Sequence, residues 1–361
     1  MASAVAQLES LVKQAAADAG FDLAGIAPAR LADSPELRFF SEWIASGYSG
    51  EMGYLSARDD TGRLKRAALE NVFPWARSVI VCALNYNTAH PRSTECKNPA
   101  RGWVSRYAWG GRQQTADYHD VVVERLRRVE ARLHQAFPDL QSRCYVDTGP
   151  VVERVFAAYS GIGWIGKNTC LMNQRLGSWL FLGVIITSLE LTPDFPAADR
   201  CGSCTRCLDA CPTQAFVAPH VLDATRCISY LTIEKRGSIP EELRAAMGNH
   251  VFGCDICQDV CPWNRKAPAT SLAEFEPALQ RFNPALAWLA SLSEEEFRGA
   301  FCGSPIRRAK RSGLRRNAII AMGNSGHRNF LPLLEELTHD PDPLVAEHAA
   351  WALRRLPKKE N

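Results

Sequence analysis

The sequence predicts an α+β protein in three parts: an α/β sandwich over residues 1–192, a cysteine-rich module over 193–268 and an α-helical unit over 269–361. Three observations lead to this division. Apolar runs of strand length alternate with amphipathic helical patterns in the first part. Eight of the 13 cysteines fall in the second. Helical patterns separated by glycine and proline turns fill the third.

The sandwich is expected to open with an amphipathic helix, because Leu8, Leu11, Val12 and Ala15 recur at helical spacing before Gly20. The run at 77–86 is continuously apolar, which suits a strand buried on both faces. In chain order, the expected elements are strands at 21–26 and 77–86, a helix at 115–137, a strand ending at 144–147, a helix at 151–159 and a strand at 178–191.

Pro193 and Pro196 mark a linker into the cysteine-rich module. The module opens with C-x2-C-x2-C-x3-C-P, the spacing of bacterial ferredoxins, in which three cysteines bind one 4Fe-4S cluster and the fourth crosses to a second. The same spacing returns later without its first cysteine, because Val251 stands there. The pattern therefore predicts a ferredoxin-like module that transfers electrons through two clusters. The first run is Cys201, Cys204, Cys207 and Cys211, and the second is Cys254, Cys257 and Cys261.

Crossing ligands divide these cysteines into one complete and one incomplete set. The first cluster is assigned Cys201, Cys204, Cys207 and Cys261. The second is assigned Cys211, Cys254 and Cys257, which leaves one iron open. The candidates for the missing ligand are Cys82, Cys96, Cys144, Cys170, Cys227 and Cys302. Only Cys227 lies between the two runs, and we take it as the eighth ligand.

Other uses of the cysteines fit less well. C-x2-C pairs also build zinc sites, but eight clustered cysteines with two Cys-Pro endings favour iron and sulfur. A disulfide framework is disfavoured because residues 1–21 carry scattered charges and no apolar signal core. No stretch approaches the about 20 apolar residues of a membrane span. We therefore expect a cytoplasmic protein that does not enter a membrane. A net charge of +3 argues against a uniformly basic nucleic-acid-binding protein, although not against a local basic patch.

A glycine motif could suggest a nucleotide site. Gly161, Gly163 and Gly166 match G-x-G-x-x-G, and Lys167 nearly completes a phosphate-binding loop. The context is wrong, because a helix precedes the glycines and Asn168 follows the lysine. A glycine turn that brings the backbone close to something is expected instead.

A second motif resembles the D-x-H-x-x-G signature of proteins that ligate cobalt through histidine. Asp117 and His119 match it, but Val122 occupies the glycine position. A solvated pair inside a helix is expected. No histidine has metal-ligand spacing, and none is assigned a catalytic role.

The C-terminal unit is expected to contain helices at 306–323, 329–339 and 343–356, separated by Gly-Asn-Ser-Gly and Asp-Pro-Asp-Pro turns. This pattern resembles one HEAT-type repeat. A single repeat needs a neighbour to bury its apolar face. We expect the cysteine-rich module or a helix near Leu286 to provide it.

Several segments together resemble the epoxyqueuosine reductases, the cobalamin and iron-sulfur enzymes of queuosine synthesis in tRNA. The similarity covers nearly the whole chain, and Phe73-Pro-Trp-Ala-Arg departs from the more usual Leu-Pro-Gly-Ala-Arg. The segments are Arg77-Ser-Val-Ile, Ser105-Arg-Tyr-Ala-Trp-Gly110, Tyr145-Val-Asp-Thr-Gly-Pro150, Gly163-Trp-Ile-Gly-Lys-Asn-Thr169, Cys227-Ile-Ser-Tyr-Leu-Thr-Ile-Glu234, Phe252-Gly-Cys-Asp-Ile-Cys-Gln-Asp-Val-Cys-Pro-Trp263 and Pro305-Ile-Arg-Arg-Ala-Lys-Arg311.

The resemblance implies a base-off cobalamin in the N-terminal part, with one cluster near the corrin and the other relaying electrons. It also implies a cluster cysteine at the Cys-Ile-Ser-Tyr motif, in agreement with the choice of Cys227. The implied cobalamin contacts are Arg66, Tyr107, Asp147, Leu171, Leu182, Ser229, Arg236, Cys254 and Asp255.

The implied reaction removes an epoxide oxygen as water and needs two electrons and two protons. Asp147 matches the family's proton donor. A carboxyl there stays protonated near neutral pH only if an apolar surface such as the corrin raises its pKa. The competing interpretation is a turn-capping aspartate, because Asp-Thr-Gly-Pro is also good turn chemistry.

A basic run is expected to bind the phosphates of tRNA carrying epoxyqueuosine. The competing interpretation is a solvated helix face. The expected tRNA contacts are Arg307, Arg308, Lys310, Arg311, Arg315 and Arg316, extended by Lys235 and Arg236. We also expect a monomer that receives electrons from a low-potential donor such as flavodoxin or ferredoxin.

Three other functions fit the sequence less well. A cobalamin-dependent reductive dehalogenase shares the cofactors but is disfavoured by the basic helical tail and by the lack of a twin-arginine signal. A non-catalytic ferredoxin-type electron carrier would give residues 1–192 no function. If the chain were a zinc-knuckle RNA-binding protein, the purified protein would be colourless.

Overall fold

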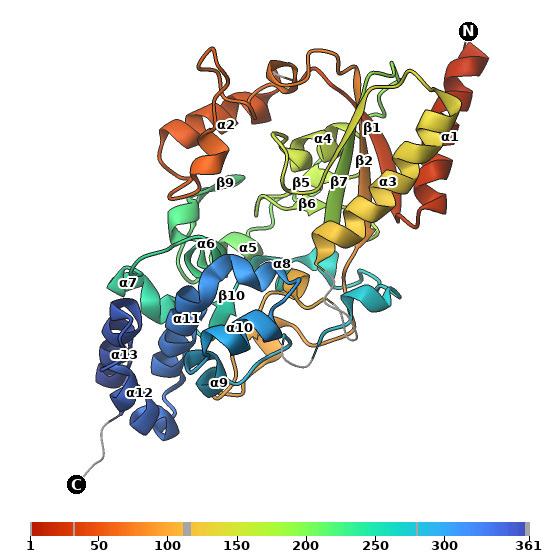
Figure 1. Cartoon of the computed structure of the whole chain (residues 1–361). Helices are drawn as coiled ribbons and strands as arrows, with labels where there is room; N and C mark the ends of the chain where they lie inside the picture. The colour runs from red at the N-terminus through yellow and green to blue at the C-terminus, as the bar shows by residue number, and fades with distance from the viewer. Residues whose placement is uncertain (1, 32, 111–116, 279–280, 358–361) are drawn as a thin grey trace.

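The computed structural model describes residues 2–31, 33–110, 117–278 and 281–357 (Figure 1). Its N-terminal part is built on an antiparallel sheet of four strands in the order β1-β2-β7-β4. β2 is buried along its whole length, as the continuous apolar run predicts. The strands are β1 (Leu23–Pro28), β2 (Ser78–Asn85), β7 (Leu180–Thr187) and β4 (Ser142–Tyr145).

Helices cover both faces of this sheet. α1 (Ala2–Asp18) and α3 (Tyr118–Ala136) lie on one side and α4 (Glu153–Tyr159) on the other (Figure 1). The side chains of β2 alternate between two cores: Ile80 packs with α1 and α3, and Val81 packs with α4. This period of two is that of a strand, and it confirms the predicted mixture of strands and helices.

The helix predicted at 115–137 spans Tyr118–Ala136 in the structure. Residues 115 and 116 lie outside the described part of the chain. The helix begins at Tyr118, because Asp117 caps it by accepting the backbone N–H of His119. Asp117 Oδ1 also lies 2.7 Å from His119 Nδ1. The expectation of a solvated pair inside a helix is therefore wrong, since the pair is half-buried at the helix N-terminus.

One helix of the N-terminal part was not predicted. α2 (Pro35–Ala45) begins at Ser34, whose hydroxyl accepts the Leu37 backbone N–H. The proline in its first turn is compatible with a helix start. Trp43 of α2 donates its indole N–H to the Leu222 carbonyl at 2.6 Å. This bond ties α2 to the cysteine-rich module.

The cysteine-rich module is joined to the N-terminal part by a shared sheet. β3 (Trp103–Val104) pairs in parallel with β10 (His250–Phe252). Both strands are fully buried. The other elements of the module are α5 (Arg206–Asp209), β8 (Phe216–Ala218), β9 (Val221–Leu222), α6 (Ile228–Ile233), α7 (Glu241–Arg244) and α8 (Ile256–Asp259).

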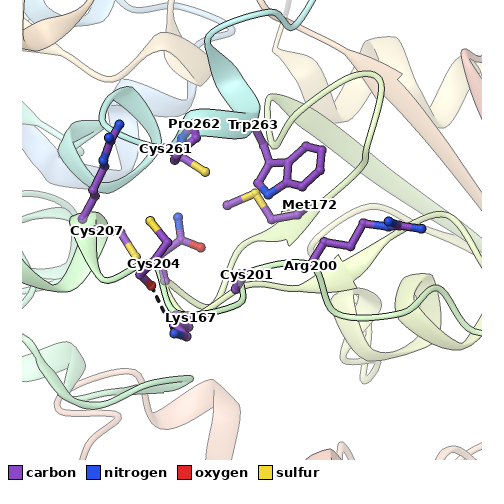
Figure 2. Close-up of a pocket in the computed structure, with 11 residues that line it drawn as sticks. Lys167, Met172, Arg200, Cys201, Cys204, Cys207, Cys261, Pro262 and Trp263 are labelled. Atoms are coloured by element: carbon purple, nitrogen blue, oxygen red, sulfur yellow. Dashed lines mark hydrogen bonds between the residues drawn. The ribbon is translucent and has the colours of Figure 1, made fainter.

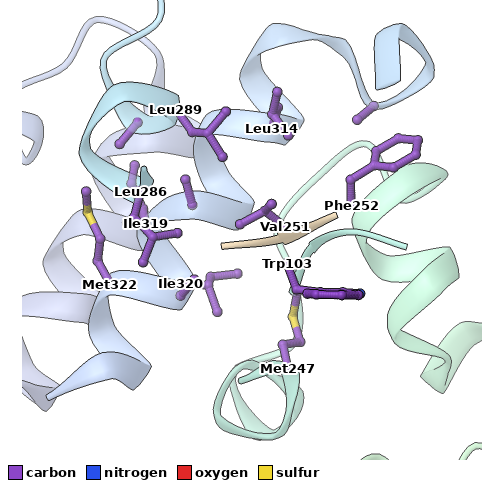
Figure 3. Close-up of a cluster of buried hydrophobic side chains, with 14 of the residues drawn as sticks. Trp103, Met247, Val251, Phe252, Leu286, Leu289, Leu314, Ile319, Ile320 and Met322 are labelled. Atoms are coloured by element: carbon purple, nitrogen blue, oxygen red, sulfur yellow. The ribbon is translucent and has the colours of Figure 1, made fainter. Parts of the chain in front are cut away.

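The C-terminal unit packs directly on this module. α11 lies against α13, α9, α6 and β10, and side chains from α9, α11, β3 and β10 meet in one buried cluster (Figure 3). Both expected supports, the module and the helix near Leu286, are confirmed. The helices are α9 (Leu286–Ala290), α10 (Glu294–Ala300), α11 (Lys310–Ser325), α12 (Leu331–Leu337) and α13 (Pro343–Arg355).

The predicted helix at 306–323 is divided. A 3-10 turn over Pro305–Ala309 precedes α11, and Gly326 ends α11 with a φ of 67°. At Gly323 a Cβ would lie 2.9 Å from the backbone of Ala352, so this glycine lets α11 and α13 approach closely. Among the described residues, no helix combines the length and the apolarity that crossing a bilayer requires.

Candidate functional site

The four cysteines assigned to the first cluster surround one cavity. Cys201, Cys204, Cys207 and Cys261 all line a space of about 270 Å³, and Figure 2 shows the sulfurs of Cys204 and Cys261 on opposite sides of it. The first run enters on the loop around α5, and Cys261 comes from the turn after α8. The structure therefore brings this predicted set together.

A hairpin holds the loops of both cysteine sets. β5 (Trp164–Ile165) pairs with β6 (Leu171–Met172). Between them, Lys167 Nζ donates to the carbonyls of Gly202 at 2.7 Å and Cys204 at 3.1 Å. Asn168 donates to the Cys257 carbonyl at 3.4 Å. The lysine and asparagine after the glycine motif thus bind the cysteine loops.

The glycines of that motif allow the hairpin to close on itself. A Cβ at Gly163 would lie 2.0 Å from the Met172 carbonyl oxygen. The expected glycine turn is confirmed, and the group that it approaches is the neighbouring strand.

The four cysteines assigned to the second cluster also gather. Burial raises the pKa of Cys254 well above its usual range, and the nearby Cys227 and Cys211 thiols add to the rise. Cys257 lies beside Cys254 and Cys227 as well. Cys227 reaches this group from the N-terminus of α6.

Val251 takes no part in either set. Its side chain is fully buried in the core below α9 and α11 (Figure 3). Its carbonyl accepts a hydrogen bond from Asn317 of α11 at 2.8 Å. At the position of the missing cysteine, β10 therefore places an apolar side chain in the core that seats the helical unit.

Cys170 is a fifth thiol at the second group. It lies close to Cys257 and near Cys227. Burial raises the pKa of the Cys227 thiol to about 11, although the backbone N–H groups of Ser229 and Tyr230 oppose the rise. Backbone N–H bonds to sulfur tune iron-sulfur clusters. Both Cys227 and Cys170 therefore lie at the second group, and Cys227 stays the predicted eighth ligand.

The donor chemistry of the first cavity fits a 4Fe-4S cluster. Trp164 packs against Cys261, and its buried indole N–H has no acceptor among the described residues. A cluster sulfur beside Cys261 would supply one. No three His, Cys, Asp or Glu side chains of the described ranges come close enough together to hold a single metal ion.

Asp147 stands at the end of β4 with its side chain exposed. Its φ is 56°, a left-handed conformation that aspartate tolerates better than most residues. Tyr118 donates its hydroxyl to Asp147 Oδ2 at 3.0 Å, and Glu153 accepts the Asp147 backbone N–H at 3.0 Å. Asp147 is therefore held by two side chains that the sequence analysis did not name.

A cationic group surrounds Tyr54 near Asp147. Arg66 bridges the carbonyls of Tyr54 and Gly149 at 2.7 and 2.6 Å. The guanidinium of Arg308 lies 5.0 Å from the Tyr54 ring centre, within cation–π range. Arg308 also pairs with Glu234. The structure thus joins the basic C-terminal unit to the loop that carries Asp147.

The remaining implied cobalamin contacts are distributed around this region. Tyr107 lies 5.9 Å from the Tyr118 ring. Leu182 and Ser229 are partly exposed, and Leu171 is buried. Arg236 is exposed and donates to the Arg308 carbonyl at 2.7 Å.

The Asp255 side chain is buried and bonded within the protein, whereas a side chain that contacts a ligand would face the ligand site. Its carboxylate is buried and accepts bonds from Trp103 at 3.1 Å, from Ser105 and from the Arg106 backbone at 2.8 Å. All of these donors belong to the segment around β3. The Asp255 side chain therefore secures β3 to the second cysteine run.

Three family models match the chain. The description "4Fe-4S double cluster binding domain" covers residues 200–264, "Epoxyqueuosine reductase QueG" covers 66–148 and "HEAT repeats" covers 306–361. A Synechocystis epoxyqueuosine reductase is 46% identical over 81% of this chain and 98% of its own length. The chain belongs to the epoxyqueuosine reductase family.

Other members agree over almost the whole chain. The Pseudomonas aeruginosa epoxyqueuosine reductase is 41% identical over 97% of this chain and 95% of its own. A crystal structure of an epoxyqueuosine reductase with a tRNA-Tyr epoxyqueuosine-modified stem loop has a TM-score of 0.87 and 34% identity, and covers 97% of this chain and 90% of that one. An oxidoreductase with a 4Fe-4S module is therefore established.

Two members of the basic run are corrected. Arg315 and Arg316 are 6% and 0% exposed. Arg315 pairs with Asp340, and Arg316 donates to the carbonyls of Leu231, Lys235 and Gly237. Neither guanidinium is free to contact tRNA phosphates. In this reductase they are structural: Arg315 holds α11 to Ala290 and Asp340 within the helical unit, and Arg316 holds α11 to the cysteine-rich module.

The other basic residues of the run differ in their exposure and in their ion pairs. Arg311 is partly buried and pairs with Glu294. Arg307 and Lys310 are exposed, and neither makes an ion pair within the described ranges.

Glu153 should make the stability of the reductase depend on pH. Burial and the nearby Asp147 carboxylate raise the pKa of Glu153 to about 7. Between pH about 4.5 and about 7, Glu153 is protonated in the native state but ionised in the unfolded chain. The stability that the protonated side chain contributes is therefore fully present below pH about 4.5 and is lost as the pH rises through 7. Glu153→Gln keeps an acceptor for Asp147. We expect it to raise the free energy of unfolding by up to about 3 kcal/mol at pH 8, with a higher Tm, and by much less at pH 5. An equal shift at both pH values in thermal unfolding would contradict this.

Proposed function

We propose that the chain reduces epoxyqueuosine in a tRNA anticodon loop to queuosine and releases the epoxide oxygen as water. The observation that carries this proposal is the exposed Asp147 carboxyl, held by Tyr118 and Glu153 beside a cationic surface. The two gathered cysteine sets supply an electron path to the same part of the molecule. The family relative with an epoxyqueuosine-modified stem loop supports the substrate.

In the proposed reaction, two electrons and two protons convert the epoxide to an alkene and water. Asp147 gives a proton to the epoxide oxygen as its carbon–oxygen bond breaks, because an unprotonated alkoxide is a poor leaving group. Tyr118 orients the carboxyl through its bond to Oδ2. Glu153 fixes the backbone of Asp147 in its left-handed conformation.

The proposed cofactors are base-off cobalamin and two 4Fe-4S clusters. Their ligand sets are the two groups of four cysteines already described. Partly exposed apolar side chains on the α4 face of the sheet, among them Leu180, Leu182 and Val152, fit the floor of a macrocycle site. Arg66, Tyr107, Ser229, Arg236 and Cys254 would hold the polar rim. Bound cobalamin would supply a strongly reducing cobalt centre.

The proposed protein is a monomer with parts at 1–192, 193–268 and 269–361. The deciding experiment incubates purified protein with tRNA carrying epoxyqueuosine, reductant and, in one arm, cobalamin. Nucleoside analysis should show queuosine only in the arm with cobalamin. The appearance of no queuosine in either arm, from protein that shows iron-sulfur absorption, would contradict the proposal.

For tRNA binding we expect charge reversal at Arg307 and Lys310 to weaken affinity. Both cations are exposed. Each phosphate that the variant no longer binds should reduce the steepness of log K against log salt by about 0.7 to 0.9. The measurement is the Kd of a modified stem loop at two salt concentrations.

The matched control for this prediction is Arg132→Glu, an exposed cation on α3. Its Kd and salt slope should equal those of the wild type. If both variants weaken binding equally, the effect reflects net charge and the basic run has no special role.

A further inference from the structure

The cavity of the first cysteine set lies at the molecular surface. Gly202, Ser203 and Thr205, which separate its cysteines, are exposed. The second set lies on the side of the proposed active site, because a Cβ at Gly253, next to Cys254, would be 3.5 Å from the Tyr107 ring. Under the proposed function, the first cluster is therefore the outer one and the second the inner one.

The rim of the outer cavity is cationic. Lys167, Arg200 and Arg206 line it. Arg200 and Arg206 are exposed, and in the described ranges neither forms an ion pair. Figure 2 shows the guanidinium of Arg200 extending away from the cysteine sulfurs. These two cations are thus available to a partner.

The nearby acids lie outside the lining of this cavity. Asp199 accepts the Cys201 backbone N–H at 2.7 Å, and Asp209 accepts the Thr205 hydroxyl at 2.8 Å. Neither carboxylate lines the cavity. Both acids stabilise the loop, and apart from the cysteines the ionisable side chains that line the cavity are cations.

We propose that an acidic one-electron carrier protein docks over this cavity and that Arg200 and Arg206 bind carboxylates on its surface. This inference rests on the proposed function, because it assigns the electron entry of that reaction. Complementary charge steers association and sets its salt dependence. Each docking oxidises one carrier by one electron and reduces the outer cluster by one, so two dockings supply one turnover.

The test replaces both arginines with glutamate, Arg200→Glu and Arg206→Glu, in the complete protein with its clusters. Reduced flavodoxin or ferredoxin of net negative charge is mixed with it without tRNA, and cluster bleaching near 400 nm is followed by stopped flow. We expect the second-order rate constant to fall about tenfold or more and its dependence on ionic strength to flatten. Reduction by dithionite, which needs no docking surface, should keep the wild-type rate.

Two matched variants separate the surfaces. Arg132→Glu should leave reduction by the carrier unchanged, and so should Arg307→Glu with Lys310→Glu. An unchanged rate in the Arg200 and Arg206 variant, or equal losses with carrier and dithionite, would overturn the proposal. Weaker tRNA binding by that variant would overturn it as well, because the rim would then be an RNA surface. If wild-type clusters are reduced but no queuosine forms, the docking surface stands and the proposed function fails.

Discussion

Asp147→Asn is expected to lower turnover of epoxyqueuosine in tRNA by about 10² to 10⁴. Asparagine keeps the size of the side chain and an oxygen that accepts the Tyr118 hydroxyl, which lies 3.0 Å from Oδ2. It has no proton to give, so the opening epoxide would have to leave as an alkoxide. Iron content, cobalamin absorption and tRNA affinity should remain those of the wild type, because the carboxyl is exposed and supports no core.

The measurement is single-turnover formation of queuosine, followed by nucleoside analysis. Asp139→Asn is the matched control, because Asp139 is also an exposed aspartate but follows α3, outside the site. Turnover by the Asp147 variant within twofold of the control would remove Asp147 as the acid. Loss of tRNA affinity in that variant would show that the residue binds substrate instead.

Cys227→Ala is expected to lower iron from about eight atoms per chain to about four and to abolish turnover. Cys227 lies with Cys211 and Cys254, and its removal leaves one iron of the inner cluster without a protein ligand. Electrons from the outer cluster would then have no relay. Iron is determined by chelation after anaerobic reconstitution, and the remaining cluster by electron paramagnetic resonance.

Cys170→Ala is the matched control for this prediction. Cys170 lies close to Cys257 of the same group but belongs to neither predicted ligand set. It should keep about eight iron atoms. If iron falls in the Cys170 variant and not in the Cys227 variant, the eighth ligand is Cys170. Unchanged tRNA affinity in both variants would show that both proteins fold.

The strands and the cysteine sets could be predicted because their signals are local. A run of consecutive apolar residues, such as residues 79–84 of β2, is typical of a strand that is buried on both faces. Cysteine spacing reflects the geometry of a cluster that a short loop must wrap around. α2 was missed although it carries local signals of a helix start, with Ser34 as the cap and Pro35 and Glu36 in the first turn. Its attachment to the cysteine-rich module through the bond between Trp43 and Leu222 is a long-range contact.

The basic run shows where such reasoning fails. Its cations look equivalent in the sequence, yet Arg307 is exposed and Arg316 is fully buried. α11 is packed against apolar neighbours on almost all sides. A basic residue within it, such as Arg316, therefore faces backbone carbonyl oxygens rather than solvent. Burial of a guanidinium is tolerated there because several carbonyls accept its N–H groups.

The sequence by itself determined the family, the mixed fold, the cysteine ligand types and the identity of the candidate acid, because each depends on residue type and spacing. Only the tertiary structure decided which thiols meet, why Val251 replaces a cysteine, and that Tyr118 and Glu153 hold Asp147. It also separated free cations from structural ones. These features depend on contacts between segments far apart in the chain, and such contacts leave no periodic signal in the sequence.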